Sequence, residues 1–222
     1  MIARRAVLAG MAALPWAGGV GAGAARAAGA GPRIVMLGDS LTQGFGLAKG
    51  YGLVPQLQDW LAQAGTPARI INHGLSGDTT YGGRVRMGRA LRGGADGVIV
   101  ELGANDLLMG WSASRAEANL DAILTRAGRG GRPLLLVGID APIRDRARRA
   151  EWAAIWPRLA ARHDALLLPD LYAPITALPD GDRAAYLLAD GVHPSAQGAA
   201  LLAAHLGPSV QALIARIAAR HR

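Results

Sequence analysis

The feature that most constrains the fold is an alternation of short apolar runs with longer segments of helical periodicity. Each apolar run is nearly continuous rather than alternating, which is typical of strands buried on both faces of a parallel sheet. They cover residues 34–37, 69–72, 98–102, 134–139 and 165–168. Helical patterns cover residues 53–64, 79–91, 113–127, 146–163 and 196–219. This order predicts an α/β fold with a central parallel sheet of about five strands and helices on both faces.

The composition indicates one globular domain. The chain has 222 residues, and hydrophobic residues make up 51% of them, which is enough for a sizeable core. We find no internal repeat and no linker. Cysteine is absent, which excludes disulfides, thiolate chemistry and cysteine-ligated metal. No two histidines have the spacing of a zinc site.

The net charge of +8 does not indicate a nucleic-acid-binding protein. The densest basic cluster consists of Arg144, Arg146, Arg148 and Arg149. Aromatic side chains do not interleave with it, so we interpret it as a solvated helix face and expect no nucleic-acid partner. A basic surface is weakly attracted to anionic lipid, so we expect at most a peripheral membrane contact.

Residues 1–27 have the pattern of a signal peptide. Arg4 and Arg5 form a basic start, a modestly apolar stretch follows, and a small-x-small cleavage pattern ends at residue 27, with a second ending at residue 30. The paired arginines favour the twin-arginine route. A membrane anchor is the alternative, but the many glycines and a proline disfavour it. We therefore predict a periplasmic or secreted protein whose mature domain covers residues 31–222.

In open parallel sheets, ligands bind beyond the carboxyl ends of the strands. The first such loop is Gly38-Asp39-Ser40-Leu41. Ser40 is a candidate nucleophile, which requires a nearby base and exposed N–H groups. The alternative is a serine that caps the next helix. The G-x-S-x-G elbow is absent, and the glycines that follow do not have G-x-G-x-x-G spacing, which disfavours a dinucleotide-binding dehydrogenase.

The last loop contains Asp190 and His193. An aspartate three residues before a histidine can fold back onto its Nδ1 atom, which makes a compact base and orienter. The alternative is a turn aspartate beside a surface histidine.

Two middle loops offer donors for an oxyanion. The backbone N–H of Gly77 and the side-chain amide of Asn105 both follow predicted strands. The alternatives are a turn glycine and a helix cap. Four apolar residues come soon after Asn105 and either cover an acyl chain or pack against the next helix; they are Leu107, Leu108, Met109 and Trp111.

Taken together, these loops resemble the four sequence blocks of the SGNH hydrolases, also called GDSL esterases. The matching blocks are Gly38-Asp39-Ser40-Leu41, Ser76-Gly77-Asp78-Thr79, Gly103-Ala104-Asn105-Asp106 and Asp190-Gly191-Val192-His193. The stretches "SGDTT", "VELGANDLL" and "AIWPRLA" are similar to the periplasmic thioesterase/lysophospholipase and arylesterase branch. The resemblance implies a three-layer α/β/α fold without metal or cofactor.

The resemblance also implies a role for each site residue. Ser40 is the nucleophile, His193 the base and Asp190 its orienter. The N–H groups of Ser40 and Gly77 form the oxyanion hole with the Asn105 side chain. Two further aspartates support their loops, and these are Asp39 and Asp78.

The implied function is a serine esterase that hydrolyses carboxylic ester or thioester bonds through an acyl-enzyme. Its substrate is then a small molecule, such as an aryl ester, an acyl thioester or a lysophospholipid, and we expect a monomer. Two alternatives stay open. One is a carbohydrate O-acetylesterase, which would also suit export. The other is a catalytically silent lipid- or glycan-binding protein with the same fold.

Overall fold

The computed structural model describes residues 31–140 and 143–222. The predicted signal peptide lies outside these residues. The sheet has five parallel strands in the order β2-β1-β3-β4-β5, which confirms the predicted sheet. The strands are β1 (Arg33–Gly38), β2 (Arg69–Gly74), β3 (Gly97–Glu101), β4 (Leu134–Val137) and β5 (Leu166–Leu168). Gly38 pairs in register with Gly74 on one side and Glu101 on the other, so three strands end level at the carboxyl edge.

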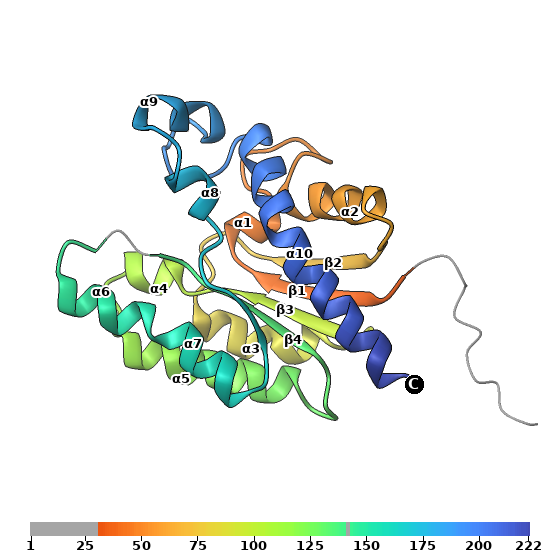
Figure 1. Cartoon of the computed structure of the whole chain (residues 1–222). Coiled ribbons are helices and arrows are strands. Elements are labelled where there is room, and N and C mark those ends of the chain that lie inside the picture. Colours follow the sequence, from red (N-terminus) through yellow and green to blue (C-terminus); the bar gives the residue numbers. More distant parts are fainter. Residues whose placement is uncertain (1–30, 141–142) are drawn as a thin grey trace, which may run out of the picture.

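Helices cover both faces of the sheet, as predicted (Figure 1). One face carries α2 (Leu53–Gln63), α8 (Ala173–Thr176) and α10 (Ala196–Arg220). The other carries α3 (Thr80–Ala90), α5 (Ala113–Ala127), α6 (Arg146–Ala153) and α7 (Ile155–Arg162). Alternate side chains of β1 face opposite layers: Ile34 and Met36 belong to the first core, and Val35 and Leu37 to the second. This is the three-layer α/β/α arrangement.

The last helix, α10, lies along the sheet and packs against α2 (Figure 1). In the part of the chain that the structure describes, it is the one helix long and apolar enough to cross a membrane. Its residues Leu202, Leu206 and Leu213 are completely buried. These side chains make α10 a core helix of the domain.

The predicted helix over residues 146–163 is in fact two helices, α6 and α7, which meet at Ala154. Pro157 explains the break. Proline has no N–H to donate to the carbonyl four residues earlier, and its ring collides with that carbonyl, here of Ala153. The apolar pattern continues through the break because Trp152 and Trp156 both enter the same core.

Several short helices were not predicted. They are α1 (Ser40–Gln43), α4 (Ala104–Leu108), α8 (Ala173–Thr176), α9 (Asp180–Arg183) and the 3₁₀ helix η1 (Ala184–Tyr186). Single turns are too short to show helical periodicity. Two of them, α1 and α4, begin within three residues of the ends of β1 and β3, so they place Ser40 and Asn105 at the carboxyl edge of the sheet.

Candidate active site

Ser40 is the first residue of α1, directly beyond β1. Asp39 caps this helix, because its Oδ1 accepts the backbone N–H of Leu41 at 3.0 Å. Ser40 therefore does not act as the cap, which was the alternative interpretation. Its side chain is free to make a contact with the other end of the chain.

The structure brings Ser40, His193 and Asp190 together. Ser40 Oγ lies 2.8 Å from His193 Nε2, and His193 Nδ1 lies 2.7 Å from Asp190 Oδ2. A carboxylate can only accept hydrogen bonds, so Nδ1 carries the proton in this pair. The neutral ring then has a free lone pair on Nε2, to which Ser40 donates. This is the arrangement of a nucleophile, a base and an orienter.

The loop that carries His193 is held from several sides. The hydroxyl of Tyr172 donates to the carbonyl of Val192 at 2.7 Å, and the N–H of Leu188 donates to the carbonyl of His193 at 2.7 Å. Burial raises the pKa of Tyr172 well above its ordinary value, so this hydroxyl stays a donor. The sequence offered no sign that Tyr172 supports the loop.

Asp190 is kept ionised by hydrogen bonds. The backbone N–H of His193 makes the largest contribution, followed by that of Val192 and by the imidazole, and together they lower the pKa of Asp190 to about 2. Both N–H groups donate to Oδ1 at 2.9 Å. The other oxygen, Oδ2, is thereby left for the histidine ring.

Gly77 lies in the loop between β2 and α3. Its φ of +76° is in the left-handed region, which glycine adopts without strain. The N–H of Ser76 donates to Gln43 Oε1 at 2.8 Å, so the loop is tied to α1 beside the serine. Gly77 therefore belongs to the same edge of the sheet as Ser40.

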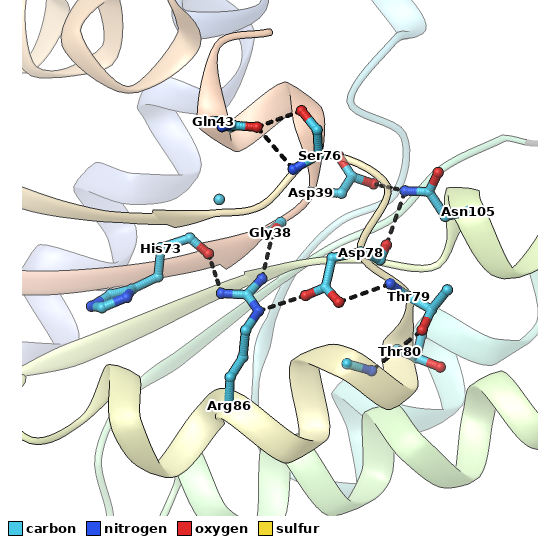
Figure 2. Close-up of polar contacts among 12 residues, drawn as sticks. Gly38, Asp39, Gln43, His73, Ser76, Asp78, Thr79, Thr80, Arg86 and Asn105 are labelled. Atoms are coloured by element: carbon cyan, nitrogen blue, oxygen red, sulfur yellow. Dashed lines mark hydrogen bonds and ion pairs between the residues drawn. The ribbon is translucent and has the colours of Figure 1, made fainter.

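Asn105, in α4, connects the loops that follow β1 and β2 (Figure 2). Its Nδ2 donates to the backbone carbonyl of Asp78 at 2.9 Å and to Asp39 Oδ2 at 3.2 Å. Asp39 and Asp78 thus accept hydrogen bonds from their own loops and from Asn105, as expected of residues that support these loops.

Gly74 allows α1 to lie directly on the end of β2. A Cβ atom at this position would be 2.1 Å from the backbone nitrogen of Gln43 and 2.6 Å from its Cα. These are backbone atoms of the helix that begins at Ser40. They cannot move aside by a change of rotamer, so the whole helix would have to shift.

The four apolar residues near Asn105 have different environments. Leu107 packs against the core on the α3 and α5 side, and Trp111 stacks under the Arg115 guanidinium at 3.9 Å. Leu108 and Met109 remain exposed, at 75% and 55%. These two fit an acyl cover better than the other two.

Three more exposed apolar side chains come from the loops at this edge. With Leu108 and Met109 they form what we call the apolar rim, which consists of Phe45, Leu75, Leu108, Met109 and Val192. The ring of Phe45 lies 4.5 Å from that of His193. Sequence reasoning missed Phe45, Leu75 and Val192, although each lies inside a motif block or within four residues of one. A large apolar residue in such a loop is the signal that could have identified them.

Two buried acids lie beneath the serine turn. Glu101 is completely buried, and its Oε2 accepts the hydroxyl of Thr42 at 2.8 Å. Burial, and then the charge of Asp39, raise the pKa of Glu101 well above its ordinary value. Burial also raises the pKa of Asp39, to about 6, although the Leu41 N–H opposes it. Within residues 31–140 and 143–222, no three acidic or histidine side chains are grouped to bind a metal ion.

The buried acids predict a pH dependence of stability. Because folding raises both pKa values, the unfolded chain loses these protons first as the pH rises above about 4, and the free energy of unfolding then falls. Each pKa unit corresponds to about 1.4 kcal/mol. We expect Glu101→Gln to flatten this fall between pH 5 and pH 8, as measured by chemical denaturation. Glu151→Gln, at an exposed site, is the control, and equal slopes in Glu101→Gln and the wild type would contradict the expectation.

Comparison with known proteins identifies the family of this chain. Residues 36–201 match the family described as GDSL-like Lipase/Acylhydrolase. The chain is 30% identical over 183 residues to "Esterase TesA" of Pseudomonas aeruginosa, and the aligned residues cover 82% of this chain and 89% of that protein. It is 29% identical over 164 residues to "Arylesterase" of Vibrio mimicus, covering 73% of this chain and 80% of that protein.

Solved structures give the same result. The crystal structure of TesA superimposes with a TM-score of 0.74 at 28% identity, over 82% of this chain and 99% of that one. AlinE4, described as an SGNH-hydrolase family esterase, superimposes with a TM-score of 0.68 at 37% identity, over 83% and 97%. The chain therefore belongs to the GDSL-like lipase/acylhydrolase family, the SGNH hydrolases, and is an enzyme that hydrolyses ester bonds.

Proposed function

We propose that the protein hydrolyses carboxylic esters or thioesters with an apolar acyl or aryl group, through an acyl-enzyme formed on Ser40. The observation that carries this proposal is the continuous chain of hydrogen bonds from Ser40 through His193 to Asp190. It supports the proposal because a serine must lose its hydroxyl proton to a base before it can attack.

The reaction follows from this geometry. Ser40 Oγ attacks the substrate carbonyl while His193 Nε2 takes its proton, and the ionised Asp190 stabilises the imidazolium that results. The tetrahedral intermediate collapses, and His193 returns the proton to the departing alcohol or thiol. Water then attacks the acyl-enzyme with the same histidine as base, which releases the acid and restores Ser40.

The oxyanion is held by the N–H groups of Ser40 and Gly77 together with the Asn105 amide. Of the two hydrogen bonds that Asn105 Nδ2 donates, the one to Asp39 is the longer, at 3.2 Å. We propose that this hydrogen is shared with the oxyanion when it forms.

Asn105→Ala removes that donor, and we expect kcat to fall by about 100-fold or more. KM should change far less, because the donor acts mainly in the transition state. Steady-state kinetics, with thermal unfolding to verify the fold, measure both. A folded variant with unchanged kcat would show that Asn105 has no part in the oxyanion hole.

The apolar rim favours substrates with a fatty acyl or aryl group, such as aryl esters, acyl thioesters and lysophospholipids. Five exposed apolar side chains near the carboxyl edge of the sheet offer contact area to such a group, whereas a sugar would leave them in water. The exposed fractions of Leu108 and Met109 make these the two that can lose most water on binding.

The test is the hydrolysis of p-nitrophenyl esters from acetate to palmitate. We expect kcat/KM to rise with acyl length, and Leu108→Ser and Met109→Ser to reduce the rise while acetate hydrolysis is retained. Val85→Ser is the matched control, because Val85 is 66% exposed on α3 and outside the rim. A preference for acetate, with acetate release from an acetylated glycan, would instead favour a carbohydrate O-acetylesterase.

We also propose that the protein is exported and acts in the periplasm or outside the cell. Support comes from the basic, then apolar, then small-x-small order of residues 1–27. Mass spectrometry of the protein from its native host should find a mature chain that begins after residue 27 or 30. An intact N-terminus would contradict export by cleavage.

A further inference from the structure

We propose that Arg86 is a positioning residue of the oxyanion hole, which sets the spacing between the loop of Ser40 and the loop of Gly77. The inference rests on the function proposed above. It concerns a side chain of α3 that belongs to none of the motif blocks.

The Arg86 guanidinium donates to three segments (Figure 2). Its Nη2 donates to the carbonyl of Gly38 at 2.7 Å, its Nη1 to the carbonyl of His73, and its Nε to Asp78 Oδ2 at 2.5 Å. Gly38 stands two residues before Ser40, and Asp78 directly follows Gly77. One rigid group therefore joins the two loops whose backbone N–H groups face the oxyanion.

The ion pair between Arg86 and Asp78 is largely removed from water. The two side chains are 20% and 7% exposed, so solvent screens the pair less than it would screen a surface pair. The planar fork of arginine fits these three acceptors at once, whereas the single ammonium of a lysine cannot reach them in the same geometry.

The third donor is joined to the same unit. The backbone carbonyl of Asp78 accepts a hydrogen bond from Asn105 Nδ2 at 2.9 Å. Arg86 thus fixes the Asp78 side chain, and the Asp78 backbone fixes the Asn105 amide. Each of the three proposed oxyanion donors is therefore at most two residues from a group that Arg86 or Asp78 binds. Losing Arg86 should let these donors shift relative to one another.

A displacement of about 1 Å at a catalytic group can cost about 100-fold in rate. For Arg86→Met we therefore expect kcat to fall by about 100-fold with KM little changed. Arg86→Lys keeps a charge opposite Asp78 and should lie between this variant and the wild type. Arg89→Met is the matched control, because Arg89 is exposed on the same helix and should behave as wild type.

A second readout separates positioning from a merely structural role. An alkyl boronic acid forms a tetrahedral adduct with the serine and places an oxygen in the oxyanion hole. Its affinity should fall by the same factor as kcat/KM in both Arg86 variants, because both report binding of the tetrahedral state.

Three outcomes would overturn the proposal. The first is a kcat and a boronate affinity equal to those of Arg89→Met, and the second is a rise in KM with kcat unchanged. The third is a lower melting temperature in a variant whose folded fraction is fully active. If Arg86→Met does not fold, Arg86→Lys decides by the same measurements. A wild-type protein inert toward every ester and toward an alkyl phosphonate would instead contradict the proposed function, and this inference with it.

Discussion

Ser40→Ala should lower the rate of ester hydrolysis by at least about 10,000-fold. The variant has no hydroxyl to attack the carbonyl, and it lacks the oxygen atom that lies 2.8 Å from His193 Nε2 in the wild type. No acyl-enzyme can then form, so the residual rate reflects only binding and polarisation of the ester. Initial rates with a p-nitrophenyl ester measure the effect, and the burst of p-nitrophenol should disappear as well.

The control is Ser114→Ala, at an exposed serine of α5, which should retain full activity. An active-serine phosphonate should add its mass to the wild type on the peptide that contains Ser40, and add nothing to Ser40→Ala. Activity that survives in a folded Ser40→Ala protein would show that another residue attacks the ester, and the proposed mechanism would be wrong.

Asp190→Asn should lower kcat by about 1,000- to 10,000-fold at neutral pH, although it is nearly isosteric. The two backbone N–H groups that donate to Oδ1 need an acceptor, so the asparagine must keep its carbonyl oxygen on that side. Its NH₂ group then points toward His193. Nδ1 would then have to accept, which moves the ring proton to Nε2. A histidine that presents N–H to Ser40 cannot take its proton.

Steady-state kinetics with a chromogenic ester measure this loss, and KM should stay within a few-fold because Asp190 does not contact the substrate. Asp182→Asn, at an exposed aspartate of α9, serves as the control. Because the pKa of Asp190 is lowered to about 2, its protonation should not limit the wild-type rate at any ordinary assay pH. A variant with near wild-type kcat would mean that other contacts orient His193.

Local pattern was sufficient to predict the central strands, because β3 and β4 are buried at every residue and consist almost entirely of apolar residues. The edge strands β2 and β5 are only partly buried, but each still contains adjacent apolar residues. Local pattern was not sufficient for the helix over residues 146–163, where the apolar stripe continues and only Pro157 interrupts the hydrogen bonding. Single-turn helices such as α1 leave no periodic signal, so their positions come from caps and contacts formed in the folded chain.

The site was predicted where its parts are local or named by a motif. Asp190 and His193 are three residues apart, and strand order placed Ser40 at the same edge although 153 residues separate it from His193. Arg86 could not be identified this way. Its bond to Gly38 spans 48 residues, and α3 has other arginines whose pattern does not tell which one reaches the end of the sheet.

The close approach of α1 to the end of β2 has a consequence for directed evolution of this enzyme. Any side chain at Gly74 would push the helix that begins at Ser40 outward, so randomising this position should yield mostly inactive clones. Within the apolar rim, Leu108 and Met109 project into solvent and can be varied without such a collision. Contact with the acyl group and the hydrogen bonds of Ser40 are thus carried by separate positions, and a library confined to Leu108 and Met109 can explore new acyl groups while the reaction itself is kept.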